Sequence, residues 1–133
     1  MKIASGSPLE DAVGYSRAVR VGSLVAVAGT TAPGSDPASQ AREILRRIAV
    51  ALDSVGATLS DVVRTRIFVT DIAHWQAVGA VHAEVFEDIR PVTTMVEVSA
   101  LIDPGLFVEI EADAFVEVTP TERTARPGAA GRK

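Results

Sequence analysis

The segment from Arg90 to Val116 constrains the fold of this chain more than any other part of the sequence. Apolar and polar residues alternate along it on both sides of the turn sequence Asp103-Pro104-Gly105. A period of two is typical of a strand with one apolar face. The proline presets φ and the glycine can adopt positive φ, so the segment predicts two strands joined by a turn. In the second strand the inward set is Val108, Ile110, Ala112, Ala114 and Val116, and the outward set is Glu109, Glu111, Asp113 and Phe115.

The outward face of this second strand carries three carboxylates. Alternate residues of a strand lie roughly 6.6–6.8 Å apart, so three ionised groups in a row repel one another. Such carboxylates are solvated, paired with arginines, or partly protonated. Arg64 and Arg66, on the strand predicted over residues 60–70, are the candidate partners. The predicted inward set of that strand is Val63, Thr65, Ile67 and Val69.

The whole chain predicts the element order β-β-α-β-α-β-β after an irregular lead-in over residues 1–13. Residues 15–21 and 24–28 predict a hairpin, because a Gly-Ser turn separates two strand-like runs. Both helices are amphipathic, and each strand has at most one strongly apolar face. The prediction is therefore one α+β domain over residues 1–118, with two helices on one side of a single sheet.

The two predicted helices have recognisable ends. Asp36 can cap the first, with Pro37 at its first position and Gly56 just past its end. Asp71 can cap the second, which ends before Arg90; a proline follows Arg90, which is therefore expected to be extended. The predicted buried stripes are Ala41, Ile44, Leu45, Ile48, Ala49, Leu52 and Val55, then Trp75, Val78, His82, Val85 and Phe86. His82 is interpreted as a packing histidine.

The predicted sheet face away from the helices mixes charged and aromatic residues. Such a face is either solvated or an interface in which arginines pair with carboxylates of another subunit. The interleaved apolar side chains favour the interface, because an apolar-studded face is poorly suited to water. The residues assigned to this face are Arg64, Arg66, Phe68, Met95, Glu97, Glu109, Glu111, Asp113 and Phe115.

Composition and charge exclude several classes of function. The net charge of −4 argues against a protein that binds nucleic acid by neutralising phosphates. The chain has no cysteine, and no His-x-x-x-His spacing indicates a metal site. No apolar run approaches the roughly 18 residues of a membrane span, and the N-terminus lacks a signal peptide, so a cytoplasmic protein is expected. Residues 119–133 are predicted to be a disordered tail, and the pairs Glu10-Asp11 and Glu87-Asp88 are expected in solvent.

Five segments of residues 12–118 stand out together: Tyr15 with the strand after it, LVAVAGTTA, DVVRTRIFVTDIAHW, PVTTMVEV, and the VEIEA string at Val108–Ala112. In this order they resemble the RidA/YjgF (Rid) family of small proteins. The resemblance implies a chorismate-mutase-like fold assembled into homotrimers, with small-molecule clefts between subunits. It also implies hydrolysis of reactive enamines and imines, such as 2-aminoacrylate, to 2-keto acids and ammonia, without metal or cofactor.

The resemblance also implies roles for individual residues. Tyr15 matches a tyrosine that closes the pocket, and Glu109 matches a glutamate that positions the attacking water. The family pattern Pro-x-Arg-Ser has a carboxylate-binding arginine where this chain has Thr93. Arg90, three residues earlier, is a candidate replacement. Two features oppose that role: an odd spacing along a strand places side chains on opposite faces, and a proline lies between the two positions.

Two functions stay open at this point. A bidentate arginine–carboxylate contact contributes a few kcal/mol, so its loss implies an altered substrate for a hydrolytic deaminase of C=N metabolites. The alternative is a trimeric protein that binds small metabolites without turnover. Endoribonuclease activity, also attributed to this family, is disfavoured by the acidic charge. In either case Gly29 and Thr30 are candidates for backbone and hydroxyl contacts to the ligand, or simply form a turn.

Overall fold

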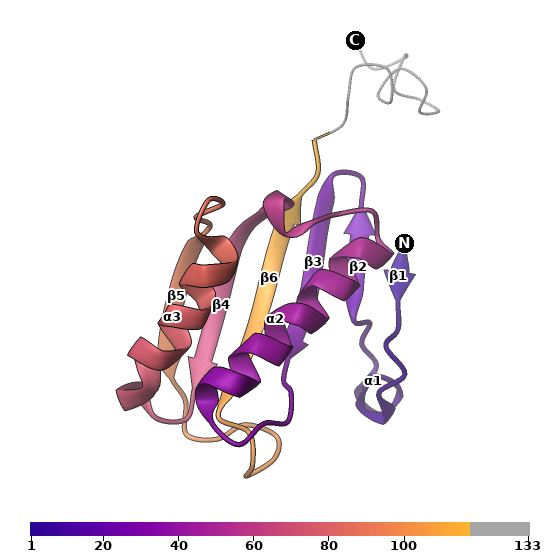
Figure 1. Ribbon diagram of the computed structural model, residues 1–133. Helices are drawn as coiled ribbons and strands as arrows, with labels where there is room; N and C mark the ends of the chain where they lie inside the picture. Colours follow the sequence, from indigo (N-terminus) through magenta and orange to yellow (C-terminus); the bar gives the residue numbers. More distant parts are fainter. Residues whose placement is uncertain (118–133) are drawn as a thin grey trace, which may run out of the picture.

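A computed structural model describes residues 1–117, which form one six-stranded sheet with two long helices on the same face (Figure 1). The strands are β1 (Lys2–Ile3), β2 (Ala18–Val21), β3 (Leu24–Thr30), β4 (Val62–Val69), β5 (Val92–Glu97) and β6 (Val108–Phe115). The helices are α1 (Pro8–Val13), α2 (Pro37–Ser54) and α3 (Trp75–Phe86), with short 3-10 helices η1 (Leu59–Asp61) and η2 (Ile72–His74). The predicted tail, residues 119–133, lies outside the described residues, as does the domain boundary at 118.

The last strand of the chain lies in the middle of the sheet. The strand order is β1-β2-β3-β6-β4-β5, and β6 runs antiparallel to both of its neighbours. β5 pairs only with β4, in parallel, and so forms one edge of the sheet. The predicted α+β class, the β2–β3 hairpin and the order of the main elements are confirmed. None of the helices within residues 1–117 is both long and apolar enough to cross a bilayer.

The predicted lead-in is wrong, because residues 1–13 contain β1 and α1. Ser7 caps α1 by accepting a hydrogen bond from the Leu9 amide, and Gly14 ends it with a φ of 90°. β1 pairs with β2 and extends the sheet at the edge opposite β5. The N-terminal segment therefore belongs to the folded domain.

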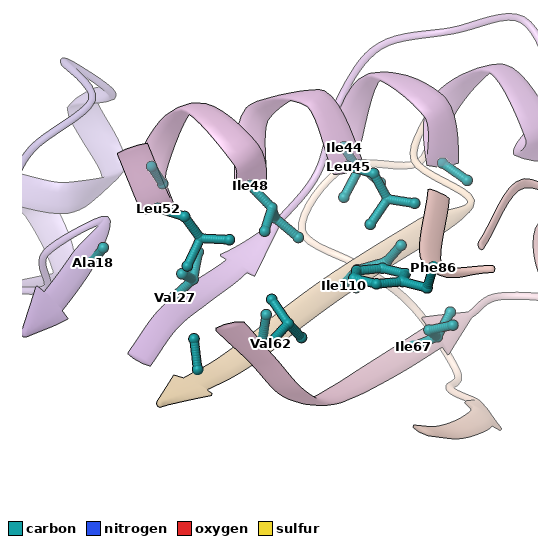
Figure 2. Packing of buried hydrophobic residues seen from close by; sticks show 14 of the residues in the cluster. Ala18, Val27, Ile44, Leu45, Ile48, Leu52, Val62, Ile67, Phe86 and Ile110 are labelled. Carbon is teal, nitrogen blue, oxygen red and sulfur yellow. The ribbon is translucent and has the colours of Figure 1, made fainter. Parts of the chain in front are cut away.

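Helix α2 supplies much of the core. The Asp36 carboxylate accepts a hydrogen bond from the Ser39 amide at 2.7 Å, Pro37 opens the helix, and Gly56 follows it with a φ of 76°. These are the predicted ends. Figure 2 shows the inward side chains of α2 packed on the sheet and on Phe86 of α3. Each large aliphatic side chain buried here stabilises the fold by about 1.5–3 kcal/mol. The largest of them are Ile44, Leu45, Ile48, Leu52, Ile67 and Ile110.

Two residues predicted to be buried are exposed. Val63 is 51% exposed because the β4–β6 register shifts between Val62 and Arg64, so Val62 enters the core in its place. Trp75 is 54% exposed because it lies at the start of α3. Val81, which lies on the inner face of α3, is buried instead.

Strand β5 presents its two sets of side chains the opposite way from the prediction. In its parallel pairing with β4, Thr93 lies beside Thr65, Met95 beside Ile67, and Glu97 beside Val69. These are core-facing positions of β4, so the assignment of Met95 and Glu97 to the charged face is wrong. Glu97 accepts a hydrogen bond from the Ile72 amide at 2.9 Å at the start of η2. Val92, Thr94 and Val96 take the other face.

We call that other face, which neither α2 nor α3 covers, the open face (Figure 1). Arg66 lies on it, with a guanidinium nitrogen 3.4 Å from Glu111 and 3.3 Å from Asp113. The prediction placed such arginine–carboxylate pairs across a subunit interface, whereas the pairs of Arg66 form within one chain. Leu24, Val96 and Phe115 are exposed beside these charges.

Candidate functional site

A cavity of about 970 Å³ contains four of the six predicted site residues. It lies between the N-terminal segment, the β2–β3 region and the second half of α2. The four residues are Tyr15, Gly29, Thr30 and Glu109. We call it the Glu109 cavity, because Glu109 is the ionisable group on which the predicted chemistry depends.

Gly29 makes room for the Glu109 carboxylate. Gly29 lies within β3, and a Cβ at this position would collide with the Glu109 side chain. Any other residue would push the carboxylate away from the strand. The close approach of backbone and carboxylate therefore explains this glycine better than turn formation does.

Glu109 is a half-buried carboxyl group with a perturbed pKa. Burial raises its pKa above the ordinary value of 4.5, and the neighbouring charge of Glu111 raises it further, while Arg17 opposes both effects. A carboxyl group that holds its proton at a higher pH than usual is suited to proton transfer. The position and the pKa together make Glu109 a candidate general acid–base.

Arg17, which was not among the predicted site residues, organises the wall of this cavity. Its guanidinium donates hydrogen bonds at 3.0 Å to both the Gly29 carbonyl and the Thr30 hydroxyl, and at 3.4 Å to the Tyr15 hydroxyl. It also lies 5.7 Å from the centre of the Tyr15 ring. The spacing Tyr15-x-Arg17 is a signal for this contact, since residues two apart in an extended segment point the same way.

A buried carboxylate holds Arg17 in place. Glu10 is only 4% exposed and lies 3.5 Å from the Arg17 guanidinium. It accepts hydrogen bonds from the backbone amide and the hydroxyl of Ser5, which lower its pKa, as does the charge of Arg17. The expectation that Glu10 lies in solvent is wrong. The N-terminal segment is thereby tied to the cavity through Glu10.

The other two predicted site residues, Thr93 and Arg90, line a second cavity of about 660 Å³. We call it the Thr93 cavity; it lies between α3 and the start of β5. Thr93 is on the helix side of the sheet, whereas Glu109 pairs with Phe68 on the open face. One chain therefore does not bring all six residues together.

Thr93 belongs to a chain of hydrogen bonds that runs into the core. Its hydroxyl lies 2.8 Å from that of Thr65, which is fully buried and lies 2.9 Å from Nε2 of His82. His82 also packs against Phe86 with ring centroids 4.6 Å apart, and burial lowers its pKa. The packing role predicted for His82 fits this geometry, with a hydrogen bond that the sequence did not reveal.

Arg90, which lies between the end of α3 and the start of β5, has an unusual backbone conformation. Its φ of 52° lies in the left-handed region, so the expectation of an extended residue is wrong. Its amide donates to the Phe86 carbonyl at 2.9 Å and its Nε to the Glu87 carbonyl at 3.0 Å. Non-glycine residues are uncommon in this region and often occur at functional sites.

Similarity to known proteins agrees with this geometry. The family model described as Endoribonuclease L-PSP matches residues 6–116. A crystal structure of Rv2704 from Mycobacterium tuberculosis, described as a member of the YjgF/YER057c/UK114 family, is 66% identical, with a TM-score of 0.86 over 87% of this chain and 98% of that one. An uncharacterized protein of Streptomyces coelicolor is 36% identical over 86% of this chain and 90% of its own length. A RutC family protein of Pyrococcus abyssi is 30% identical over 77% and 87%.

The family match spans nearly all of the described chain, including all six predicted site residues. The arrangement of one sheet with two helices on one face is also shared with solved members of the family. The chain therefore belongs to the RidA/YjgF family and has its chorismate-mutase-like α+β fold.

Proposed function

We propose that this protein is a hydrolytic deaminase of enamine or imine metabolites, with Glu109 as the group that positions and deprotonates water. The observation that carries the proposal is the half-buried Glu109 carboxyl group, whose pKa is raised by burial, facing the wall formed by Gly29, Tyr15 and Arg17. The reaction needs no metal or cofactor, because the carbon of a C=N bond is already electrophilic, and an enamine acquires such a carbon when it tautomerises to the imine.

The proposed reaction has two stages. Water adds to the carbon of the C=N bond, Glu109 accepts a proton from that water, and the nitrogen gains a proton. The resulting carbinolamine then loses its hydroxyl proton as the C–N bond breaks, which gives a carbonyl compound and ammonia. Glu109 suits this exchange because a carboxyl group with a raised pKa can accept a proton and return it. Tyr15 is proposed to contact the substrate beside Glu109. Thr30, the other predicted contact, is buried, and its hydroxyl donates to the Ala28 carbonyl at 2.8 Å and accepts from Arg17, so it supports the cavity wall.

We further propose that the complete site forms between subunits of a homotrimer. Support comes from the two cavities, which lie apart in one chain, and from the exposed apolar side chains of the open face, such as Leu24 and Phe115. The Thr93 cavity of one subunit would then face the Glu109 cavity of its neighbour. Light scattering should give about 42 kDa, three times the chain mass of 13.9 kDa. A monomer mass at micromolar concentration would contradict this proposal.

The substrate is proposed to differ from that of relatives that carry the family arginine. Thr93 cannot form a charge-assisted fork to a carboxylate. Arg90 lines the same cavity and is the candidate for contact with an anionic group. Because its Nε is bound to the Glu87 carbonyl, its two terminal nitrogens would make that contact.

The alternative is a trimer that binds small metabolites without turnover, and the uncharged Thr93 is the observation that favours it. The deciding experiment measures release of keto acid and ammonia from an imino acid generated in situ by an amino-acid oxidase. Release above the uncatalysed rate that disappears in Glu109→Gln would support the deaminase. No release by the intact trimer from any imine tested would favour the binding protein. The net charge of −4 gives no support for a ribonuclease.

A further inference from the structure

The hydrogen of the Thr93 hydroxyl is already used inside the protein. The Thr93 oxygen lies 2.8 Å from the Thr65 hydroxyl and 3.3 Å from the Pro91 carbonyl. A hydroxyl has one hydrogen to donate and two lone pairs that accept. The direction of the hydrogen bonds that link Thr93, Thr65 and His82 decides which neighbour of Thr93 receives that hydrogen.

In both possible directions of the hydrogen-bond chain, the Thr93 oxygen keeps at least one lone pair that can accept a hydrogen bond from a ligand. If Thr65 donates to Nε2 of His82, then Thr93 donates to Thr65 and keeps both lone pairs. If His82 donates to Thr65, then Thr65 donates to Thr93, which donates to the Pro91 carbonyl and keeps one lone pair. Accepting a hydrogen bond from a ligand therefore breaks no internal bond. Donating one to a ligand breaks the bond to Thr65 or to Pro91.

The charges around the Thr93 cavity also favour a ligand that donates a hydrogen bond over one that carries a carboxylate. Its lining includes two carboxylates, Glu84 and Glu87, and one guanidinium, that of Arg90. Burial lowers the pKa of His82, so its ring adds little positive charge at neutral pH. These two negative charges and one positive charge sum to −1, so a ligand carboxylate placed at Thr93 would meet an oxygen lone pair without a net positive charge to offset it.

We propose that Thr93 selects substrates with a hydrogen-bond donor, an amide or amino N–H or a hydroxyl, where substrates of arginine-bearing relatives have a carboxylate. This inference rests on the proposed function and names its substrate class: imines or enamines of amides and similar neutral compounds. Thr93 is a specificity-determining residue that acts through its oxygen. Thr65 and His82 are positioning residues that hold this oxygen and keep its hydrogen bonded within the protein, either to Thr65 or to the Pro91 carbonyl.

The test compares two stable product analogues that differ in one group. Pyruvamide carries an amide where pyruvate carries a carboxylate, and both have the same ketone. Binding of each is measured by titration of the full-length protein, followed by amide NMR shifts. The protein is expected to bind pyruvamide about tenfold more tightly than pyruvate, since one hydrogen bond is gained and one repulsion is avoided.

Two variants assign the preference to the Thr93 oxygen. Thr93→Val keeps the shape but removes the oxygen, and should bring the ratio of the two affinities close to one. Thr93→Ser keeps the hydroxyl and should retain most of the preference. The NMR spectrum of each variant also reports whether it is folded.

Three results would overturn the inference: pyruvate binding as tightly as pyruvamide, no binding of pyruvamide, or an unchanged ratio in folded Thr93→Val. Ammonia release that depends on Glu109 would leave the proposed deaminase standing in each of these cases. Loss of that activity alone, with the amide preference intact, would reject the deaminase and keep the specificity of Thr93.

Discussion

The Glu109 cavity and the Thr93 cavity are built in different ways. The first rests on β3 and β6, in the interior of the sheet, and its charged groups hold one another: Glu10 holds Arg17, and Arg17 holds Tyr15 and Thr30. The second rests on edge strand β5, and the groups tied to Thr93 are hydroxyls and an imidazole. The proposed water chemistry thus lies where the fold is hardest to change, and the proposed ligand selection lies at an edge.

This difference explains how one half of the site can change while the other persists. Loss of Arg17 would leave the buried Glu10 carboxylate without its cation, and an unpaired buried charge is strongly destabilising. Thr93 is exposed, so substitutions there leave no buried charge behind. Ligand preference can therefore vary at position 93 at little cost in stability.

The largest effect on activity is expected from a substitution in the Glu109 cavity, in the interior of the sheet. Glu109→Gln should lower the rate of ammonia release at least 100-fold, because an amide cannot take up a proton from the attacking water. Binding of pyruvamide should change much less, since the side chain keeps its shape. The assay is kcat for ammonia release from imines generated in situ. Asp113→Asn is the matched control, because Asp113 lies on the same face but pairs with Arg66.

A gain in activity toward imino acids is expected from a substitution in the Thr93 cavity, at the edge of the sheet. Thr93→Arg should raise kcat/KM for imino acids by about 30- to 150-fold, which corresponds to about 2–3 kcal/mol from a bidentate carboxylate contact. Thr93→Lys supplies charge without the planar fork and should gain less. If Thr93→Arg gives no gain in an intact trimer, the cleft does not join position 93 to Glu109.

Arg17→Gln tests the mutual support within the Glu109 cavity. Because Arg17 opposes the upward shift of the Glu109 pKa, its removal should move that pKa further upward. The free energy of unfolding should fall by about 2 kcal/mol, since Glu10 loses a charged partner. Carboxyl carbon NMR shifts and urea denaturation measure the two effects. Arg20→Gln is the control, as Arg20 binds backbone carbonyls of Gly22 and Val55; an equal Glu109 shift there would refute the argument.

The smallest expected effect is a gain in stability for Glu109→Gln. A carboxyl group whose folded pKa is raised contributes stability that is complete below its ordinary value of 4.5 and is lost as pH rises through the folded pKa. Glutamine does not ionise, so the variant should melt a few degrees above the natural protein at pH 7. The difference should vanish near pH 4. Scanning calorimetry at both pH values measures it, and a lower melting temperature at pH 7 would show that the ionised carboxylate is stabilised instead.

Much of the fold follows from local pattern. The ends of α2 could be predicted because Asp36, Pro37 and Gly56 act through local backbone geometry. The alternation in β6 could be predicted because its two faces differ sharply in polarity. In β5 both faces mix threonine with apolar residues, so only the parallel register with β4 shows that Thr93 faces α3.

The candidate site came from the family resemblance and not from local pattern, since the resemblance matched Tyr15 and Glu109. The structure places these two residues with Gly29 and Thr30 along one cavity. Arg17 was missed although it follows Tyr15 by two positions, because its partners Glu10 and Gly29 come from segments whose packing no local pattern reveals. The Thr65–His82 hydrogen bond joins residues 17 positions apart on different elements and could not be read from spacing.

The central position of β6 has a consequence for how the chain acquires this structure. β3 and β4 do not pair with each other; each pairs with residues 108–115. Before that segment is available, the β2–β3 hairpin and the β4–β5 pair have no strand to join them. Such long-range closure slows folding and leaves strand edges open to other chains in the meantime. We therefore expect a newly made chain to acquire its sheet and the carboxylate of Glu109 in one late step, so that no shorter intermediate has the Glu109 cavity.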